Sequence, residues 1–287
     1  VYCESCYPGE GSEYIREYHS FDKDLVFYPK PDSESLFLGV ELETDKYNDI
    51  ENCAELLHER SDDEELYHLE SDSSLNSGME IVSMPCTLDY HRDNFPWGRI
   101  TKTVAEHGGR AHDTSTCGMH IHINRSFFGS RIDYHTLKLL YIFEKFWPEM
   151  VNFSRRSGDR WERYAARYYD DFAHVSDISE KIEETRDKGR YFAVNLSPCH
   201  TIELRLFRGT LNIDTIHASL EIVDFLARLV KDVTIQDLQR MTWKSLTDRI
   251  DDEKYPKLRY YLYTRELVNQ PNIDEPTTIE SGDYNNS

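Results

Sequence analysis

Two patterns of apolar and polar residues recur along the chain, one with the period of a strand and one with the period of a helix. The first predicts strands over residues 36–44, 64–70, 78–84, 117–124, 190–196 and 201–208. The second predicts helices over residues 50–60, 99–107, 133–153, 176–187, 211–232, 235–239, 242–248 and 253–269. Short groups of strands separated by helices are typical of α+β folds, so we expect an α+β protein with an antiparallel sheet.

The same pattern divides the chain into three parts. Residues 1–35 are rich in proline, glycine, acidic and aromatic residues, which predicts an irregular lead-in. Residues 36–270 carry the predicted strands and helices and are expected to form one domain. Residues 271–287 contain too few apolar residues to fold, and they predict a disordered tail.

The lead-in contains a C-x-x-C pair, Cys3 and Cys6. Two thiolates at this spacing can bind one tetrahedral zinc ion, although a complete site needs further ligands. The alternative is a pair of thiols without a metal. We therefore interpret residues 1–35 as the remnant of a zinc-ribbon-like segment that holds Zn²⁺ only if other ligands complete it.

Composition limits the classes of function. The 287 residues are 39% hydrophobic, which is enough for a sizeable core, and their formal net charge is −20. This charge repels phosphodiester backbones and anionic lipids, so we expect neither nucleic acid nor a membrane as a partner. No apolar run is long enough to span a membrane. Six cysteines, mostly in apolar segments, are typical of a reduced cytoplasmic protein.

The strand predicted over residues 36–44 carries two glutamates, Glu41 and Glu43, at alternate positions. Their carboxylates leave the same face about 6.6 Å apart along the strand. They would repel each other by roughly 2.5 kcal/mol at an effective dielectric constant of about 20. On an exposed strand both would be solvated. Leu38 and Val40 instead indicate a buried strand, where a bound cation would remove the penalty.

Two further strands carry side chains that metal sites use. Glu80 follows a turn that contains Asp72, and His120 and His122 alternate along residues 117–124. Taken singly, Glu80 and Asp72 are ordinary strand and turn residues, and one strand histidine is more often structural. Paired imidazoles after a glycine favour a site, because imidazole binds Mn²⁺ or Zn²⁺ and donates hydrogen bonds to phosphate.

The strand predicted over residues 201–208 adds Glu203, Arg205 and Arg208. Glu203 and Arg205 share one face by alternation, so a metal ligand lies beside a guanidinium. This pairing suits phosphate chemistry, because a metal ion and an arginine together stabilise the charge of a phosphoryl group in transfer. The alternative is an ion pair within the strand, worth about 0–1 kcal/mol if exposed.

Four motifs together resemble the amidoligase family of the carboxylate–amine ligases, a superfamily that includes glutamine synthetase and glutamate–cysteine ligase. GMHIH is similar to a strand of glutamine synthetase, and GVELE, DSSLNSGMEIVSMP and TIELRLFRGTLN are similar to amidoligase motifs in the same order. The resemblance covers residues 36–212. It implies an antiparallel sheet curved into a half-barrel and backed by helices, as in the glutamine synthetase catalytic domain, with ATP in its hollow. Members with an N-terminal C-x-x-C ribbon are familiar, which strengthens the zinc prediction for Cys3 and Cys6.

The resemblance assigns roles to individual residues of this chain. The implied ligands of two or three Mg²⁺ or Mn²⁺ ions are Glu41, Glu43, Glu80, His120 and Glu203. The implied catalytic group is Glu203, Arg205 and Arg208, and the implied nucleotide contacts are His122, Asn195, Arg205 and Arg208. Asp72, Arg155 and Arg156 match less closely, and the two arginines are expected either near substrate or in a charged helical turn.

The implied function is an ATP-dependent ligase that joins a carboxylate to an amine through an acyl phosphate. The substrate would be a peptide, protein or cell-wall component in the cytoplasm of a bacterium or a phage-infected cell. No nucleophilic cysteine or serine motif is present, in agreement with direct attack by an amine. The alternatives are a phosphotransferase of the same fold and a non-catalytic interaction module that retains the pocket. A metal hydrolase is disfavoured, because its H-x-H motif opens a parallel βα barrel. The two substrates and the oligomeric state are left open.

Overall fold

The computed structural model describes residues 12–18, 20–32, 34–112, 114, 116–156 and 161–269. The expected zinc site at Cys3 and Cys6 and the expected tail at residues 271–287 lie outside these ranges.

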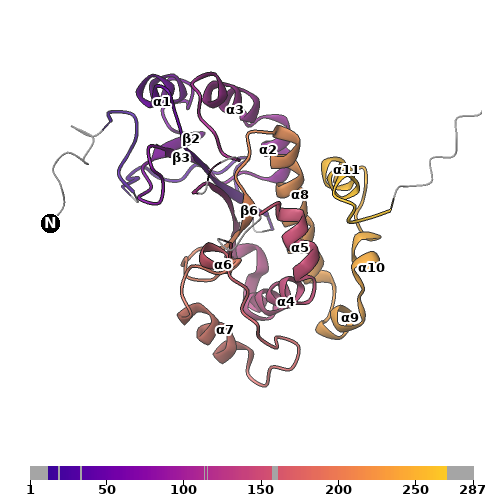
Figure 1. Cartoon of the computed structure of the whole chain (residues 1–287). Helices are drawn as coiled ribbons and strands as arrows, with labels where there is room; N and C mark the ends of the chain where they lie inside the picture. Colours follow the sequence, from indigo (N-terminus) through magenta and orange to yellow (C-terminus); the bar gives the residue numbers. More distant parts are fainter. Residues whose placement is uncertain are drawn as a thin grey trace, which may run out of the picture.

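Six strands form one open antiparallel sheet in the order β2-β3-β1-β4-β6-β5 (Figure 1). The strands are β1 (Leu38–Thr44), β2 (Tyr67–Glu70), β3 (Met79–Ser83), β4 (Gly118–Asn124), β5 (Val194–Asn195) and β6 (Thr201–Arg208). Each lies within a range predicted from the alternating pattern. The predicted α+β fold with an antiparallel sheet is therefore confirmed, whereas the half-barrel likeness to glutamine synthetase stays a prediction.

Helices back the sheet. They are α1 (Ile50–His58), α2 (Leu88–Asp93), α3 (Trp97–Glu106), the 3₁₀ helix η2 (Arg125–Arg131), α4 (Ile132–Lys145), α5 (Trp147–Ser154), α6 (Trp161–Tyr164), α7 (Ile178–Asp187), α8 (Ile213–Asp232), α9 (Ile235–Arg240), α10 (Trp243–Thr247) and α11 (Pro256–Thr264). Within the described ranges, no helix combines the length and the apolar character needed to cross a membrane.

The core lies between one face of the sheet and the helices, with α8 at its centre. This helix contacts β4 as well as α2, α3, α4 and α11, and α11 lies on its outer side (Figure 1). In β1, Leu38, Val40 and Leu42 point into the core and are at most 1% exposed. Because side chains alternate along a strand, the polar residues between them face the opposite side of the sheet.

The described part of the lead-in borders that polar face. Arg16 forms a bridge with Glu70 at the end of β2, and its guanidinium pairs with the buried carboxylate of Glu64 at 2.6 Å. Farther along, the amide of Tyr28 donates to the carbonyl of Pro85 at 3.0 Å. The lead-in thus packs against the sheet and forms part of the wall above its polar face.

Three of the differences between the predicted and the observed elements have a local cause. The helix expected over 133–153 is two helices, α4 and α5, because Pro148 lies in the first turn of α5 and has no backbone N–H to continue α4. The strand expected from residue 64 begins at Tyr67, since Glu64 has a left-handed backbone (φ 65°). The short helix α2 was not predicted, and it begins where the Thr87 hydroxyl accepts from the amide of Tyr90 at 3.3 Å.

Candidate metal and nucleotide site

Strand alternation and register bring acidic side chains together on the polar face of the sheet. Glu41 and Glu43 lie two residues apart in β1. Glu43 pairs with Glu80 of β3, and Glu41 pairs with His120 of β4. The central strand therefore carries two carboxylates, with one further potential ligand on each neighbouring strand.

Glu203 completes this group from β6, on the other side of β4. Its carboxylate lies 3.3 Å from Nδ1 of His120 and also pairs with the guanidinium of Arg205. Asn195, from the short strand β5, donates to the second oxygen of Glu203 at 2.6 Å. Two neighbours thus fix the orientation of the Glu203 carboxylate toward His120.

The imidazole of His120 lies at the centre of the group. Its Nδ1 is 3.1 Å from Glu41 and its Nε2 is 3.9 Å from Glu43. Two sets of potential ligands share this ring, Glu41 with Glu203 and Glu43 with Glu80, and in each set the ligand atoms lie within 4.8 Å of one another. We call the five residues Glu41, Glu43, Glu80, His120 and Glu203 the acidic cluster.

A cavity of about 340 Å³, which we call the charged cavity, is lined by four members of the acidic cluster, Glu41, Glu43, Glu80 and His120. Glu203 does not line it but contacts two residues that do, His120 and Arg205. The volume is typical of small-molecule sites.

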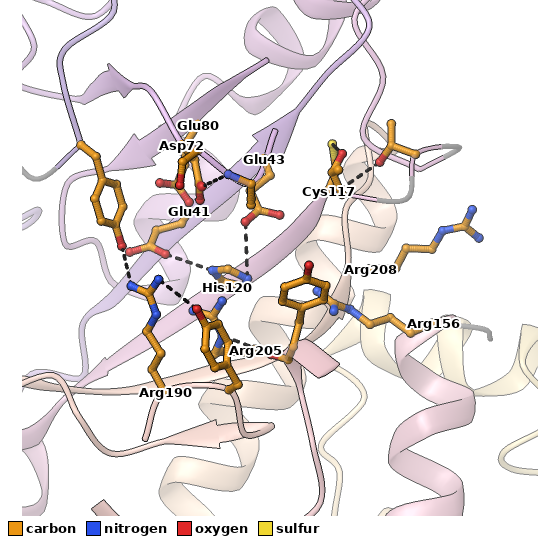
Figure 2. Close-up of a pocket in the computed structure, with 17 residues that line it drawn as sticks. Glu41, Glu43, Asp72, Glu80, Cys117, His120, Arg156, Arg190, Arg205 and Arg208 are labelled. Carbon is orange, nitrogen blue, oxygen red and sulfur yellow. Dashed lines mark hydrogen bonds and ion pairs between the residues drawn. The ribbon is translucent and has the colours of Figure 1, made fainter. Parts of the chain in front are cut away.

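Figure 2 shows the carboxylates on one side and the side chains of Arg156 and Arg205 on the other, with Arg190 at the mouth. Arg208 also lines the cavity, but its guanidinium is directed away from the carboxylates, toward the carbonyl of His112. Negative and positive walls that face each other suit a ligand that carries both bound cations and phosphate groups.

An irregularity in β6 brings Arg208 into this cavity. Between the pairs Met119–Phe207 and Ile121–Leu204, β6 has one residue more than β4, which is a β-bulge. Phe207 is consequently buried in the core. Arg208 follows it onto the polar face, where its Nε donates to the carbonyl of His112 at 2.8 Å.

The carboxylates of the acidic cluster perturb each other. Burial, and then the charges of Glu41 and Glu43, raise the pKa of Glu80 well above its usual value. Burial opposes ionisation of Glu41 as well, but His122 and His120 outweigh it and hold the pKa of Glu41 well below its usual value. Burial lowers the pKa of Arg156 to about 10, although the nearby Glu43 acts in the opposite direction.

Two buried acids elsewhere in the described part of the chain have dedicated partners. Glu144 accepts from Nε of Arg167 at 2.8 Å, and Asp224 accepts from the Tyr255 hydroxyl at 2.7 Å. In the acidic cluster, by contrast, carboxylates crowd around one imidazole. Carboxylate oxygens and an imidazole nitrogen are donors that Mg²⁺ and Mn²⁺ accept. The residues present therefore fit divalent ions.

Gly118 permits the close approach of three of these side chains. Its amide donates to the Glu43 carboxylate. A Cβ at this position would lie 2.2 Å from Nη2 of Arg156 and 3.2 Å from Nε2 of His120. The absence of a side chain here leaves room for both charged groups at the end of β4.

Of the three residues that were predicted less closely, two line the charged cavity and one does not. Asp72, in the turn between β2 and β3, and Arg156 line the charged cavity. Arg155 does not line it, because its left-handed backbone (φ 59°) ends α5 and turns the chain; it lies beside Asp214 and Lys257 instead. The structure thus brings only the second of the two arginines, Arg156, to the site.

Two predicted nucleotide contacts occupy other positions. Asn195 is buried behind Glu203 and reaches the charged cavity only through that residue. His122 lines a neighbouring groove, where its Nε2 lies 3.0 Å from Glu41 and its Nδ1 lies 2.8 Å from the Thr201 hydroxyl. A direct contact of either residue with nucleotide stays a prediction.

Sequence reasoning missed the residues at the mouth of the charged cavity. Arg190 donates to the hydroxyls of Tyr18, at 3.3 Å, and Tyr191, at 3.2 Å, and Tyr164 packs edge-on against Tyr191. These residues come from the lead-in, α6 and the loop before β5. No periodic pattern marks them, because only the tertiary structure brings these segments together.

Comparison with known proteins agrees with this arrangement. The model of the family described as "putative amidoligase enzyme" matches residues 42–227. This range includes Glu43, Glu80, His120, Glu203 and Arg205. No curated protein matches the chain. Since the match covers more than half of the sequence, the chain belongs to the amidoligase family.

Proposed function

We propose that this protein is an ATP- and divalent-metal-dependent ligase that joins a carboxylate to an amine. The observation that carries the proposal is the charged cavity, whose lining contains four carboxylates (Glu41, Glu43, Asp72 and Glu80), the imidazole of His120 and four arginines. Membership of the amidoligase family supports a ligase. The acidic wall supports bound cations, and the arginines support a polyphosphate.

The residues of the acidic cluster would hold Mg²⁺ or Mn²⁺. His120 is shared by the two sets of potential ligands, so two ions held there would lie close together. When bound, such ions neutralise negative charge on phosphate oxygens. Arg205 and Arg208 would bind the phosphates from the opposite side, and the ion pair with Glu203 orients Arg205 for that contact.

The proposed reaction consists of two transfers, first of a phosphoryl group to the carboxylate and then of the acyl group to the amine. A carboxylate oxygen of the substrate attacks the terminal phosphorus of ATP, a P–O bond forms, the bond to the leaving phosphate breaks, and ADP is released. The amine nitrogen then attacks the acyl carbon, the C–O bond to phosphate breaks, and the nitrogen loses a proton. The products are an amide, ADP and inorganic phosphate. Arg205 would contact the phosphoryl group as charge develops on it in the first transfer, so we propose it as the catalytic arginine.

The side chains of the cavity favour this route over a covalent enzyme intermediate. Cys117 is the only thiol among the described lining residues. Burial raises the pKa of this thiol to about 12, which leaves it protonated at neutral pH and a poor nucleophile. Activation by phosphate needs no such group. A peptide, protein or cell-wall component in the cytoplasm remains the proposed substrate class.

The test is a search for condensation products. Purified protein is incubated with ATP, MgCl₂ or MnCl₂, and a small-molecule and peptide fraction of a bacterial lysate. Mass spectrometry should find ATP-dependent products whose mass equals that of two reactants less one water. With a carboxylate labelled with oxygen-18, label should pass into the released phosphate. A phosphorylated product without amide would assign a phosphotransferase, and no ATP consumption would refute the proposal.

A pair of arginine variants makes the test specific for the cavity. Arg205 of the charged cavity pairs with Glu203, and Arg167 pairs with Glu144 away from the cavity. Arg205→Ala should lower turnover by roughly 10²-fold, and Arg205→Lys should restore only part of it, because an ammonium group cannot replace the planar guanidinium. Arg167→Ala breaks a similar ion pair and should leave turnover nearly unchanged. Equal losses in both alanine variants would point to a general effect of lost ion pairs.

A further inference from the structure

A second cavity, of about 500 Å³, lies on the same face of the sheet as the charged cavity. It is found toward the start of β1 and the end of β4, whereas Glu43 and Gly118 lie at the opposite ends of these strands. The apolar side chains that line it are Leu25, Phe27, Phe37, Val82 and Pro85. We call this cavity the apolar groove. Such a lining favours a ligand with an apolar body.

The apolar groove is continuous with the charged cavity through Glu41, which lines both. One oxygen of this carboxylate lies 3.1 Å from His120, on the side of the charged cavity. The other lies 3.0 Å from His122, on the side of the groove. A ligand in the groove would therefore meet the same carboxylate that belongs to the acidic cluster.

The two cavities differ in the charge that they can accept. The charged cavity contains four arginines, whereas Arg125 is the only arginine or lysine among the described residues around the groove. The Arg125 guanidinium already makes hydrogen bonds within the protein, since it donates to the backbone carbonyls of Leu196 at 2.8 Å and Thr201 at 3.0 Å. Glu41 is the only acid in that described lining. The groove thus favours an amino group over a carboxylate or a phosphate.

Gly39 leaves open space in the groove. It lies two residues before Glu41, on the same face of β1. A Cβ at Gly39 would meet its nearest atom, Cβ of His122, at 3.6 Å, which is an ordinary contact. The backbone therefore has room for a side chain at this position, and that room is available to a ligand.

We infer that the apolar groove binds the amine substrate, with an apolar body against Phe27 and Val82 and its amino group toward Glu41. This inference rests on the proposed function. Binding in this orientation brings the amine nitrogen to the edge of the charged cavity, where a phosphorylated carboxylate would lie. The ligase would accordingly prefer an amine with an apolar or aromatic group over ammonia or a small polar amine.

Binding of simple probes tests the inference without ATP or turnover. Calorimetry with MgCl₂ present compares 2-phenylethylamine, which has an apolar body and an amino group, with ethanolamine and phenylacetate. We expect 2-phenylethylamine to bind at least tenfold more tightly than either of the others. Equal binding of phenylacetate would overturn the charge argument, and equal binding of ethanolamine would overturn the apolar argument.

Two glycine variants localise the probe. Gly39→Val fills the groove, whereas Gly98→Val adds the same side chain on α3, where the nearest atom to a Cβ is also 3.6 Å away. We expect Gly39→Val to weaken binding of 2-phenylethylamine at least tenfold and Gly98→Val to leave it unchanged. The increase in Tm caused by Mg²⁺ should survive in Gly39→Val, which shows that the acidic cluster is intact.

Three results would overturn the inference. These are no binding of 2-phenylethylamine at millimolar concentration, equal binding to the Gly39→Val variant, and displacement of the probe by adenosine. Displacement would instead assign the groove to the base of the nucleotide and would support a nucleotide contact for His122. Failure of the proposed ligase function is detected separately, as the absence of ATP-dependent product formation.

Discussion

Replacing Glu80 by glutamine should stabilise the protein in the absence of metal ions. Oxygens of Glu80 and Glu43 lie within 4.8 Å of each other. Two full charges at that separation repel by about 3.5 kcal/mol at an effective dielectric constant of about 20. The raised pKa of Glu80 means that proton uptake already relieves part of this repulsion. We therefore expect Glu80→Gln to raise the free energy of unfolding by about 1–2 kcal/mol, or Tm by about 2–8 °C.

Divalent ions should stabilise Glu80→Gln less than they stabilise the wild type. An ion at 100 times its Kd stabilises the native state by about 2.7 kcal/mol. Loss of one carboxylate is expected to weaken binding roughly tenfold, which removes about 1.4 kcal/mol of that gain. Glu80→Gln should thus be more stable than the wild type in EDTA and should gain less from Mg²⁺ or Mn²⁺.

The assay is thermal unfolding in EDTA and over a titration of MgCl₂ or MnCl₂. The matched control is Glu144→Gln, which removes the charge of a buried acid that has a partner in Arg167. This control should lower Tm in EDTA and keep the full gain from metal. The reasoning is refuted if Glu80→Gln lowers Tm in EDTA, or if its gain from metal equals that of the wild type.

Three further substitutions test other parts of the structure. Gly118→Ala places a methyl group against Arg156. Calorimetry should then show weaker binding of ATP with Mg²⁺, whereas urea unfolding should show only a small loss of stability. Unchanged ATP binding would contradict this. Asn195→Ala removes the hydrogen bond to Glu203 and should lower the free energy of unfolding by about 1–2 kcal/mol. It should also weaken metal binding. Intact metal binding would show that Asn195 does not position Glu203. Burial raises the pKa of Glu221 in α8 from 4.5 to about 7 in the folded protein. The protonated carboxyl therefore contributes fully to stability below the pKa of 4.5 that it has in the unfolded chain, and this contribution is lost as pH rises from there through 7. Relative to wild type, Glu221→Gln should therefore gain about 2 kcal/mol from about pH 5.5 to about pH 8 in urea unfolding, and a constant difference would refute the shift.

The fold could be predicted where local patterns dominate. Alternation in β1 and β4 and the helical spacing of α8 gave the correct elements, because one face of each is buried. Pro148 shows what can be overlooked, since a long apolar pattern concealed a helix break that the proline itself indicates. The helix α2 is too short for its spacing to be distinguished from a loop. The strand order was not predictable from any local pattern, because it depends on pairing between distant segments.

The candidate site shows the same division. Alternation alone places Glu41 with Glu43 and Glu203 with Arg205, but it cannot show that β1, β3, β4 and β6 are neighbours. The motif resemblance supplied that step. Arg190 was missed because it comes from a loop, where no period relates a residue to its neighbours in space. Arg155 and Arg156 could not be separated from sequence, since the left-handed residue that turns them apart is not a glycine.

The additional residue in β6 makes the length of this strand as important as its composition. The extra residue changes which positions after Arg205 point into the core and which point to the polar face. Phe207 can therefore pack in the core while Glu203, Arg205 and Arg208 all lie on the polar face. If β6 kept all its residues but alternated strictly from Glu203 onward, without the bulge, Phe207 would lie on the polar face and Arg208 in the core. A bulky ring would then enter the cavity and a guanidinium would enter the core, although both residues would still be present. For this strand, loss of the bulge would be equivalent to two unfavourable substitutions at once.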